Sequence, residues 1–284
     1  MRPVDIGVDA ARILTRPGSG RVRAVFSRAL YLDVPGGLMA LCSTRVPRGP
    51  LHLRMTALPA VLTGSPVLVA TESLRLGDDA YQLTAPVWAP RLPPVSTLRR
   101  AHKEARDWLP SLGPTLDLGA TLDPGPAEDA GLPGAALAAL RRGDLLTFAG
   151  LVGGRGAGLT PAGDDLLAGV LLVACALGDG SPTGSWTLQR CAHRAPTNDI
   201  ARAFIGAAAR GRCIEPAHSL LNGLADADRR AVQSAADELR RFGSSSGAAL
   251  TYGIRTALLE LPNRAVESPR STVPPPCRVA YSER

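Results

Sequence analysis

Lysine and aromatic residues are scarce in this 284-residue chain. Lys103 is the only lysine, so arginine supplies almost all of the positive charge behind the net charge of +7, and Phe, Trp and Tyr make up 4%. Proteins that bind nucleic acid cluster basic side chains on one face or add aromatic rings that stack on bases. Here arginine pairs such as Arg240-Arg241 lie in Ala- and Leu-rich stretches, which is typical of solvated helix faces. We expect no nucleic-acid partner.

Cysteine and histidine are also few, and their spacing fits neither disulfides nor structural zinc. The five cysteines are an odd number without a C-x-x-C pair, and the four histidines are scattered. Disulfide frameworks use even sets of cysteines, and structural zinc sites use closely spaced ligands. The first residues, MRPVDIGVDAARIL, lack the basic-then-apolar order of a secretion signal. The pattern predicts reduced thiols and a cytoplasmic protein.

Long hydrophobic runs are absent as well. The longest run covers residues 166–177 and contains Gly169, whereas a membrane-spanning helix needs about 20 apolar residues. We therefore expect a buried core helix here and no membrane partner. With 45% hydrophobic residues, the chain can build one large core or two modest ones.

The first third of the chain has the pattern of short strands. Turn residues separate the segments, and Pro35-Gly36-Gly37 is a candidate hairpin turn. The strands are expected at residues 20–34, 38–46, 51–55, 66–77 and 80–90. Short, regularly spaced strands predict a small barrel or sandwich. The proline-rich residues 89–95 mark its end, because proline interrupts regular structure.

The remainder of the chain has the pattern of helices. They are expected at residues 96–109, 135–149 (broken), 161–178, 197–211, 215–224, 225–243 and 244–262. Strands followed by helices indicate an α+β fold, with a β-rich, barrel- or sandwich-like N-terminal part and a mostly helical C-terminal part. We place a β-rich domain at residues 1–95, a helical domain at 96–262 and a flexible tail at 263–284. The Gly/Pro-rich insert at residues 113–134 is expected to be functional or mobile.

The stretch at residues 150–178 joins a glycine-rich loop to the apolar helix. Gly153, Gly154, Gly156 and Gly158 permit positive φ angles and a close approach of the backbone to a ligand. Thr160 is placed to cap the helix and Pro161 to occupy its first position. A helix start of this kind has free amides and a positive dipole end, so it predicts a phosphate or carboxylate site. Arg155 in the loop is a further donor for the same anion.

Two adjacent carboxylates, Asp164 and Asp165, follow in the first turn. One interpretation is structural: the helix dipole favours acidic residues there by roughly 0.3–1 kcal/mol, and a carboxylate can accept hydrogen bonds from the loop amides. The other is functional: Asp165 faces the anion site and holds Mg²⁺ or orients a substrate amide. Gly169, one turn later, lets another segment pack closely. The residues alone leave both interpretations open.

Two further helix starts share this polar character. Thr197-Asn198-Asp199 supplies hydroxyl and amide groups, and the turn at residues 243–247 is rich in serine. If the three helix starts converge, they form a polar, anion-accepting pocket. Ser246 lacks the G-x-S-x-G context of a strand-to-helix nucleophile, so we do not expect it to act as one.

Residues 156–171, GAGLTPAGDDLLAGVL, resemble the signature G-x-G-L-T-P-x-G-D-D-x-L-x-G of the bacterial AllH-like family, long described as of unknown function. Residues 20–32 resemble its opening strand, and residues 197–211 resemble its T-x-x-I-x…A-x-x-G segment. Residues 243–254, GSSSGAALTYGI, resemble its G-H-S-S-G element, with Ser244 where the family has histidine. The resemblance spans roughly residues 20–260.

The family includes a subunit of oxamate carbamoyltransferase. The resemblance therefore implies a part in carbamoyl transfer between carbamoyl phosphate and a small amide such as oxamate, in allantoin breakdown, together with other carbamoyltransferase subunits. A non-catalytic small-anion-binding or scaffold subunit stays open as an alternative. Because of Ser244, so does a stand-alone acyl or carbamoyl transferase or hydrolase in another pathway.

The residues and the resemblance together define a candidate site. Asp164 and Asp165 are the expected catalytic residues, and Asp165 is the expected ligand if a metal such as Mg²⁺ binds; no other cofactor is indicated. Binding of the small anionic substrate is expected of Arg155, Gly156, Gly158, Thr160, Gly163, Thr197, Ser245 and Ser246.

Overall fold

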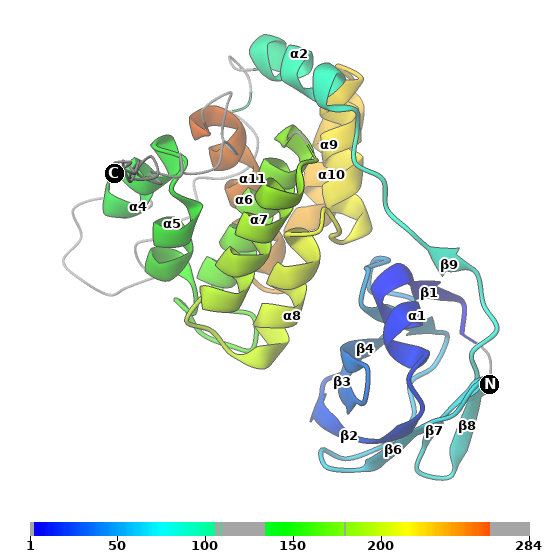
Figure 1. Ribbon diagram of the computed structural model, residues 1–284. Helices are drawn as coiled ribbons and strands as arrows, with labels where there is room; N and C mark the ends of the chain where they lie inside the picture. Colours follow the sequence, from blue (N-terminus) through cyan, green and yellow to red (C-terminus); the bar gives the residue numbers. More distant parts are fainter. Residues whose placement is uncertain (1–2, 106–108, 110–133, 179, 262–284) are drawn as a thin grey trace, which may run out of the picture.

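The computed structural model of the chain describes residues 3–105, 109, 134–178 and 180–261. An N-terminal sheet that curls upon itself is followed by a bundle of helices (Figure 1). The predicted α+β class, with strands first and helices second, is confirmed. Residues 113–133 of the predicted insert and the predicted tail at 263–284 lie outside the described residues.

Within the described residues, nine strands form one sheet in the order β8-β7-β6-β2-β3-β4-β5-β1-β9. Neighbouring strands are antiparallel except for the pairs β4–β5 and β1–β9. The strands are β1 (Asp5–Gly7), β2 (Gly18–Val25), β3 (Ala29–Val34), β4 (Gly37–Ser43), β5 (His52–Met55), β6 (Pro66–Val69), β7 (Ser73–Leu76), β8 (Asp79–Gln82) and β9 (Val87–Trp88).

The predicted turn at Pro35-Gly36-Gly37 joins β3 to β4, where Val34 pairs with Gly37. Two predicted single strands are in fact hairpins: residues 20–34 are β2 and β3, and residues 66–77 are β6 and β7. Their turns carry no glycine or proline, so composition does not reveal them. Strand β1 and helix α1 (Val8–Leu14) were not predicted, because each is too short for a periodic pattern.

The two faces of the sheet have different neighbours. Along β3, Leu30, Leu32 and Val34 are buried in the core of the sheet part. Tyr31 alternates with them and points the other way, where its ring meets Phe204 of α8 edge-on, with 6.2 Å between ring centroids. The second face of β3 is therefore turned toward the helices.

The helices follow the predicted segments closely. They are α2 (Val95–Ala105), α4 (Gly134–Arg141), α5 (Leu145–Val152), α6 (Ala162–Leu177), α7 (Pro182–Arg194), α8 (Asp199–Ala208), α9 (Glu215–Ala225), α10 (Arg229–Arg240) and α11 (Ser246–Glu260). Among them α7 had no counterpart in the prediction. None of the helices within the described ranges combines the length and apolar character that a membrane span requires.

Helix α6 is the buried centre of the bundle, as its apolar sequence predicts, and it packs tightly on α11. Glycines make this approach possible. A Cβ atom at Gly169 would lie 2.5 Å from the Leu250 carbonyl oxygen, and one at Gly253 would lie 2.1 Å from that of Leu166. Both distances are shorter than real contacts allow, so each helix needs a glycine where it faces the other. The predicted packing role of Gly169 is confirmed.

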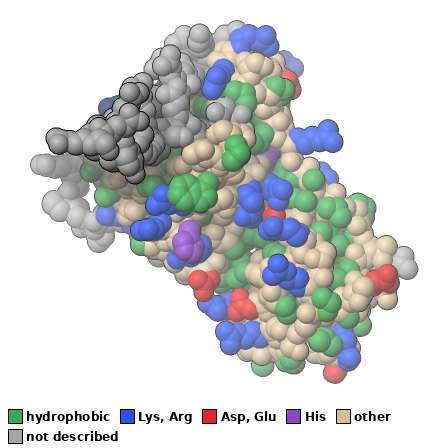
Figure 2. Space-filling view, viewed as in Figure 1, with side chains coloured by type: hydrophobic (Ala, Val, Ile, Leu, Met, Phe, Trp, Pro, Cys, Tyr) green, Lys and Arg blue, Asp and Glu red, His purple; other side chains and the backbone are tan. Residues whose placement is uncertain are grey.

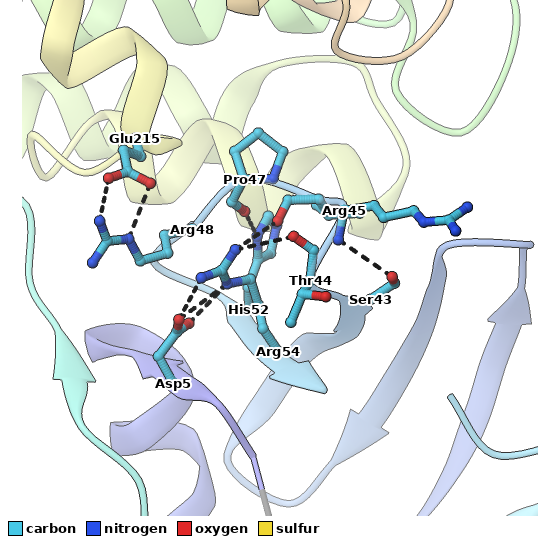
Figure 3. Close-up of polar contacts among 10 residues, drawn as sticks. Asp5, Ser43, Thr44, Arg45, Pro47, Arg48, His52, Arg54 and Glu215 are labelled. Carbon is cyan, nitrogen blue, oxygen red and sulfur yellow. Dashed lines mark hydrogen bonds and ion pairs between the residues drawn. The ribbon is translucent and has the colours of Figure 1, made fainter. Parts of the chain in front are cut away.

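Ion pairs link the sheet part to the helical part. The carboxylate of Asp9, fully buried in α1, accepts from Arg210 at 3.3 Å and from Arg212 at 2.5 Å, both just after α8. Arg48 pairs with Glu215 at the start of α9 (Figure 3). Separating the two parts would leave buried charges without partners, which is costly. These ion pairs therefore fix the position of the sheet part against the helical part.

Candidate functional site

The start of α6 differs from the prediction in its cap. Pro161 is the N-cap residue, with φ −51° and ψ 146°, and no side chain caps the helix. The extended conformation of Pro161 delays the first helical residue to Ala162. The hydroxyl of Thr160 lies instead 3.1 Å from that of Ser246 on α11.

Three amides at this helix start already donate to backbone carbonyls. Gly163 N–H donates to the Arg155 carbonyl at 2.9 Å, and the N–H groups of Asp164 and Asp165 donate to the Pro161 carbonyl at 2.9 and 3.2 Å. The first of these bonds folds the loop back onto the helix, and the other two belong to the first turn of α6. These three amides are therefore not free donors for an anion.

Asp164 serves the structural role that the sequence left open. Its carboxylate accepts from the Gly154 N–H at 2.7 Å and from the Thr197 hydroxyl at 2.5 Å. Burial raises the pKa of Asp164, although both hydrogen bonds and the charge of Arg202 oppose the rise. The carboxylate therefore ties the glycine-rich loop to the segment before α8. We call Asp164, Gly154 and Thr197 the loop clasp.

A cavity of about 430 Å³ lies between the sheet and the helices. From the helical side, Thr160, Asp165 and Ser246 line it. Tyr31, Ala40 and His52 line it from the sheet, where they form one row across β3, β4 and β5. The small side chain in the middle of this row leaves the space that the cavity occupies.

Asp165 is held in a different environment from its neighbour Asp164. Its Oδ2 atom is buried and has no hydrogen-bond partner among the described residues. Burial raises the pKa of Asp165 to about 7; the Ser246 hydroxyl opposes this rise and the charge of Asp164 adds to it. A carboxyl group with a pKa near 7 can hold or release a proton at neutral pH. It is the one acidic side chain of α6 that lines the cavity.

His52 contributes a neutral imidazole to the sheet wall. Its Nδ1 atom lies 3.0 Å from the Pro47 carbonyl oxygen (Figure 3), and burial lowers its pKa to about 4. A carbonyl oxygen can only accept, so Nδ1 carries the proton and Nε2 is left as an acceptor. Burial also raises the pKa values of Cys42 and Tyr31 to about 12, so both stay protonated.

The exposed charged side chains that line the cavity are mostly arginines, with the carboxylate of Glu238 beside them. Arg28, Arg45 and Arg241 are exposed and line it, and no salt bridge joins any of them to another described residue. In Figure 2, Lys and Arg side chains gather where the sheet and the helices meet. Arg241 was interpreted from sequence as part of a solvated helix face, and that interpretation missed its position at the cavity.

A buried ion pair holds the loop that carries Arg45. Arg54 on β5 donates to Asp5 on β1 at 2.9 Å and to the Val46 carbonyl at 3.0 Å (Figure 3). Because these partners flank the loop, the backbone beside Arg45 is fixed while its guanidinium stays exposed at the opening. No motif marks these residues; the alternating pattern of the strands is the only sequence signal of which residues face the helices.

The predicted site residues are only partly brought together. Thr160, Asp165 and Ser246 line the cavity, whereas Asp164 and Thr197 form the loop clasp. Residues outside the cavity lining are Arg155, Gly156, Gly158, Gly163 and Ser245. No group of three His, Cys, Asp or Glu side chains suited to a metal occurs in the part of the chain that the structure describes. Asp165, named from sequence as the ligand if Mg²⁺ binds, is therefore not part of such a group.

Residues 151–258 match the family described as oxamate carbamoyltransferase subunit AllH. No curated protein and no solved structure gives a significant match. The match begins in α5 and ends in α11, so it includes the helical wall of the cavity and the loop clasp but not the sheet wall. Over residues 151–258 the chain is therefore AllH-like, as the signature at residues 156–171 predicts.

Proposed function

We propose that this chain is a carbamoyltransferase subunit whose cavity, between the sheet and the helices, binds a small anionic substrate. The AllH match supports the reaction class, because the family is described as a subunit of oxamate carbamoyltransferase. The observation that carries the proposal is the cavity itself. Arg28, Arg45 and Arg241 are exposed residues of its lining, and Asp165 lies on its helical wall.

The three arginines suit the phosphate of carbamoyl phosphate or the carboxylate of an acceptor. They come from the β2–β3 turn, the β4–β5 loop and the end of α10. A guanidinium group offers a planar pair of donors that matches a carboxylate or a phosphate. Side chains from three separate elements converge only if the fold brings the elements together. A purely solvated set of arginines has no reason to do so.

Asp165 and Ser246 are the residues that we assign to the uncharged end of the substrate. An amide N–H needs an acceptor, and the Oδ2 atom of Asp165 is an acceptor without a partner. Ser246 lies beside it and contacts Thr160. In the proposal, Asp165 orients the amide and exchanges its proton, whereas Asp164 acts indirectly by fixing the loop before α6.

A non-catalytic anion-binding or scaffold subunit is the second candidate. It is favoured by the loop clasp, which gives a structural reason for the most distinctive residues of the motif. In this case the chain binds the anion for a partner subunit that carries the chemistry. Both candidates share the arginine-lined cavity, so binding is tested first and turnover second.

Calorimetric titration with inorganic phosphate, carbamoyl phosphate and oxamate tests the binding site. We expect Arg45→Gln and Arg241→Gln each to weaken binding about 10-fold or more, the range for one lost charge-assisted contact. Arg230→Gln is the matched control, because Arg230 is an exposed arginine of α10 outside the cavity lining. No binding of any of the three anions, or equal loss in the control, refutes the proposal.

Turnover with the partner subunits present separates the two candidates. If Asp165 takes part in the chemistry, Asp165→Asn removes carbamoyl transfer while anion binding and the unfolding midpoint stay close to the wild-type values. If the chain is a scaffold, the same variant retains transfer. Full activity of Asp165→Asn therefore contradicts the catalytic assignment but leaves the binding site intact.

A further inference from the structure

The inner walls of the cavity are apolar. Behind the exposed arginines, the helical part contributes Phe204, Ala207, Ile214 and Leu250, and Phe242 lies between α10 and α11. Ala207, Ile214 and Leu250 are each at most 5% exposed. Several polar side chains interrupt this surface; they are Tyr31, His52, Thr160, Asp165, Arg212, Glu238 and Ser246. The lining thus combines exposed arginines with an extensive apolar surface.

Oxamate and carbamoyl phosphate would leave the apolar part of this lining without a partner. Every carbon atom of both molecules is bonded to oxygen or nitrogen, so neither has an apolar surface to bury. Polar groups that enter an apolar site without hydrogen-bond partners lose favourable hydration. The volume of about 430 Å³ also lies in the range of cavities that enclose drug-sized ligands, roughly 300–1,000 Å³. Both observations point to a larger ligand.

We propose that the cavity selects a carboxylate with an apolar body in addition to the amide that Asp165 orients. Its carboxylate lies at Arg28, Arg45 and Arg241 and its body against Phe204, Ile214 and Leu250. The inference rests on the proposed anion site and names the class of substrate that this site takes. Ala29, Ala40 and Ala168 line the same space, and their small side chains leave room for the body of the ligand.

A homologous series of carboxylates measures this preference directly. Acetate, butanoate and hexanoate share one head group and differ only in methylene groups. Each methylene buried against the apolar walls is expected to tighten binding about four-fold. In calorimetric titration, hexanoate therefore binds more tightly than butanoate, butanoate more tightly than acetate, and both longer acids more tightly than oxamate.

Two kinds of variant distinguish the binding of the carboxylate group from the burial of the apolar body. Ala29→Leu fills part of the cavity from β3, where Ala29 is half-buried. It is expected to weaken hexanoate binding several-fold and to leave acetate binding unchanged. Arg45→Gln is expected to weaken all three acids by the same factor. Ala29→Val repeats the first test with a smaller side chain that suits a strand, in case the leucine variant does not fold.

Equal affinity for acetate and hexanoate overturns the inference, and so does tighter binding of oxamate than of the longer acids. Binding of phosphate together with no binding of any carboxylate also overturns it, while the proposed anion site survives. Failure of the proposed function has a different signature, because then phosphate, carbamoyl phosphate and every carboxylate fail to bind to the folded protein.

Discussion

Removing the carboxylate of the loop clasp is expected to destabilise the protein. In Asp164→Ala the Gly154 N–H and the Thr197 hydroxyl lose the acceptor that they reach at 2.7 and 2.5 Å. A hydrogen bond to a charged group contributes about 1.5–3 kcal/mol, so two contribute about 3–6 kcal/mol. Asp164 is only 2% exposed, and the cost of burying its charge offsets part of this gain. The expected loss is about 2–4 kcal/mol.

Urea unfolding followed by circular dichroism measures this loss. Thr197→Val keeps the shape of the side chain and removes one donor, so it is expected to cost about 1–2 kcal/mol. The double variant Asp164→Ala/Thr197→Val should lose less than the sum of the two single variants, because both remove the same hydrogen bond. This non-additivity separates the clasp from two unrelated effects of packing.

The adjacent carboxylate provides the control. The Oδ2 atom of Asp165 has no partner among the described residues, so Asp165→Asn breaks no comparable bond and is expected to leave stability at neutral pH equal or higher. If Asp164→Ala changes the unfolding free energy by less than about 0.5 kcal/mol, the usual size of neutral surface effects, the clasp does not hold the loop. If Asp165→Asn is the more destabilising variant, the two roles are reversed.

Three further outcomes are expected. The folded state raises the pKa of Asp165 from 3.8 to about 7, so between these pH values the folded protein holds a proton that the unfolded chain releases. The free energy of unfolding should therefore fall as the pH rises from about 4 to 7. Asp165→Asn should flatten this dependence of the unfolding free energy on pH. Asp9→Asn should cost about 3 kcal/mol in urea unfolding and free Arg212, because it breaks a buried ion pair. Gly169→Ala should lower the unfolding free energy by about 1–3 kcal/mol, since its Cβ would lie 2.5 Å from the Leu250 carbonyl oxygen; wild-type stability would contradict that packing.

Sequence patterns predicted the helical part well because its signals are local. The apolar run that forms α6, the glycine after α10 and the caps of the later helices lie within the segments that they define. The hairpin turn between β2 and β3 was not predicted, because its signal is not local. Residues 26–28 are Phe-Ser-Arg, and the turn is set by the pairing of the flanking strands rather than by turn residues.

The site was harder to predict, because its parts are distant in the chain. Asp164 meets Thr197 across 33 positions, and no spacing rule connects them. The sheet wall depends on strand register, which places Tyr31, Ala40 and His52 in one row. A one-residue shift in any of these strands would turn its side chain to the other face. The sequence therefore indicated the helical wall through its motif and was silent about the sheet wall.

The paired aspartates now have separate explanations that follow from helix geometry. Consecutive residues of an α-helix point about 100° apart around its axis, so two neighbouring carboxylates project in different directions. Asp164 faces the loop and accepts its amide, and Asp165 faces the cavity without a partner for Oδ2. The position of Asp165 depends on Asp164, because the loop clasp fixes the helix start from which Asp165 projects. Exchange of either carboxylate for its amide should thus produce different defects: loss of stability at Asp164, and loss of proton exchange with the bound ligand at Asp165.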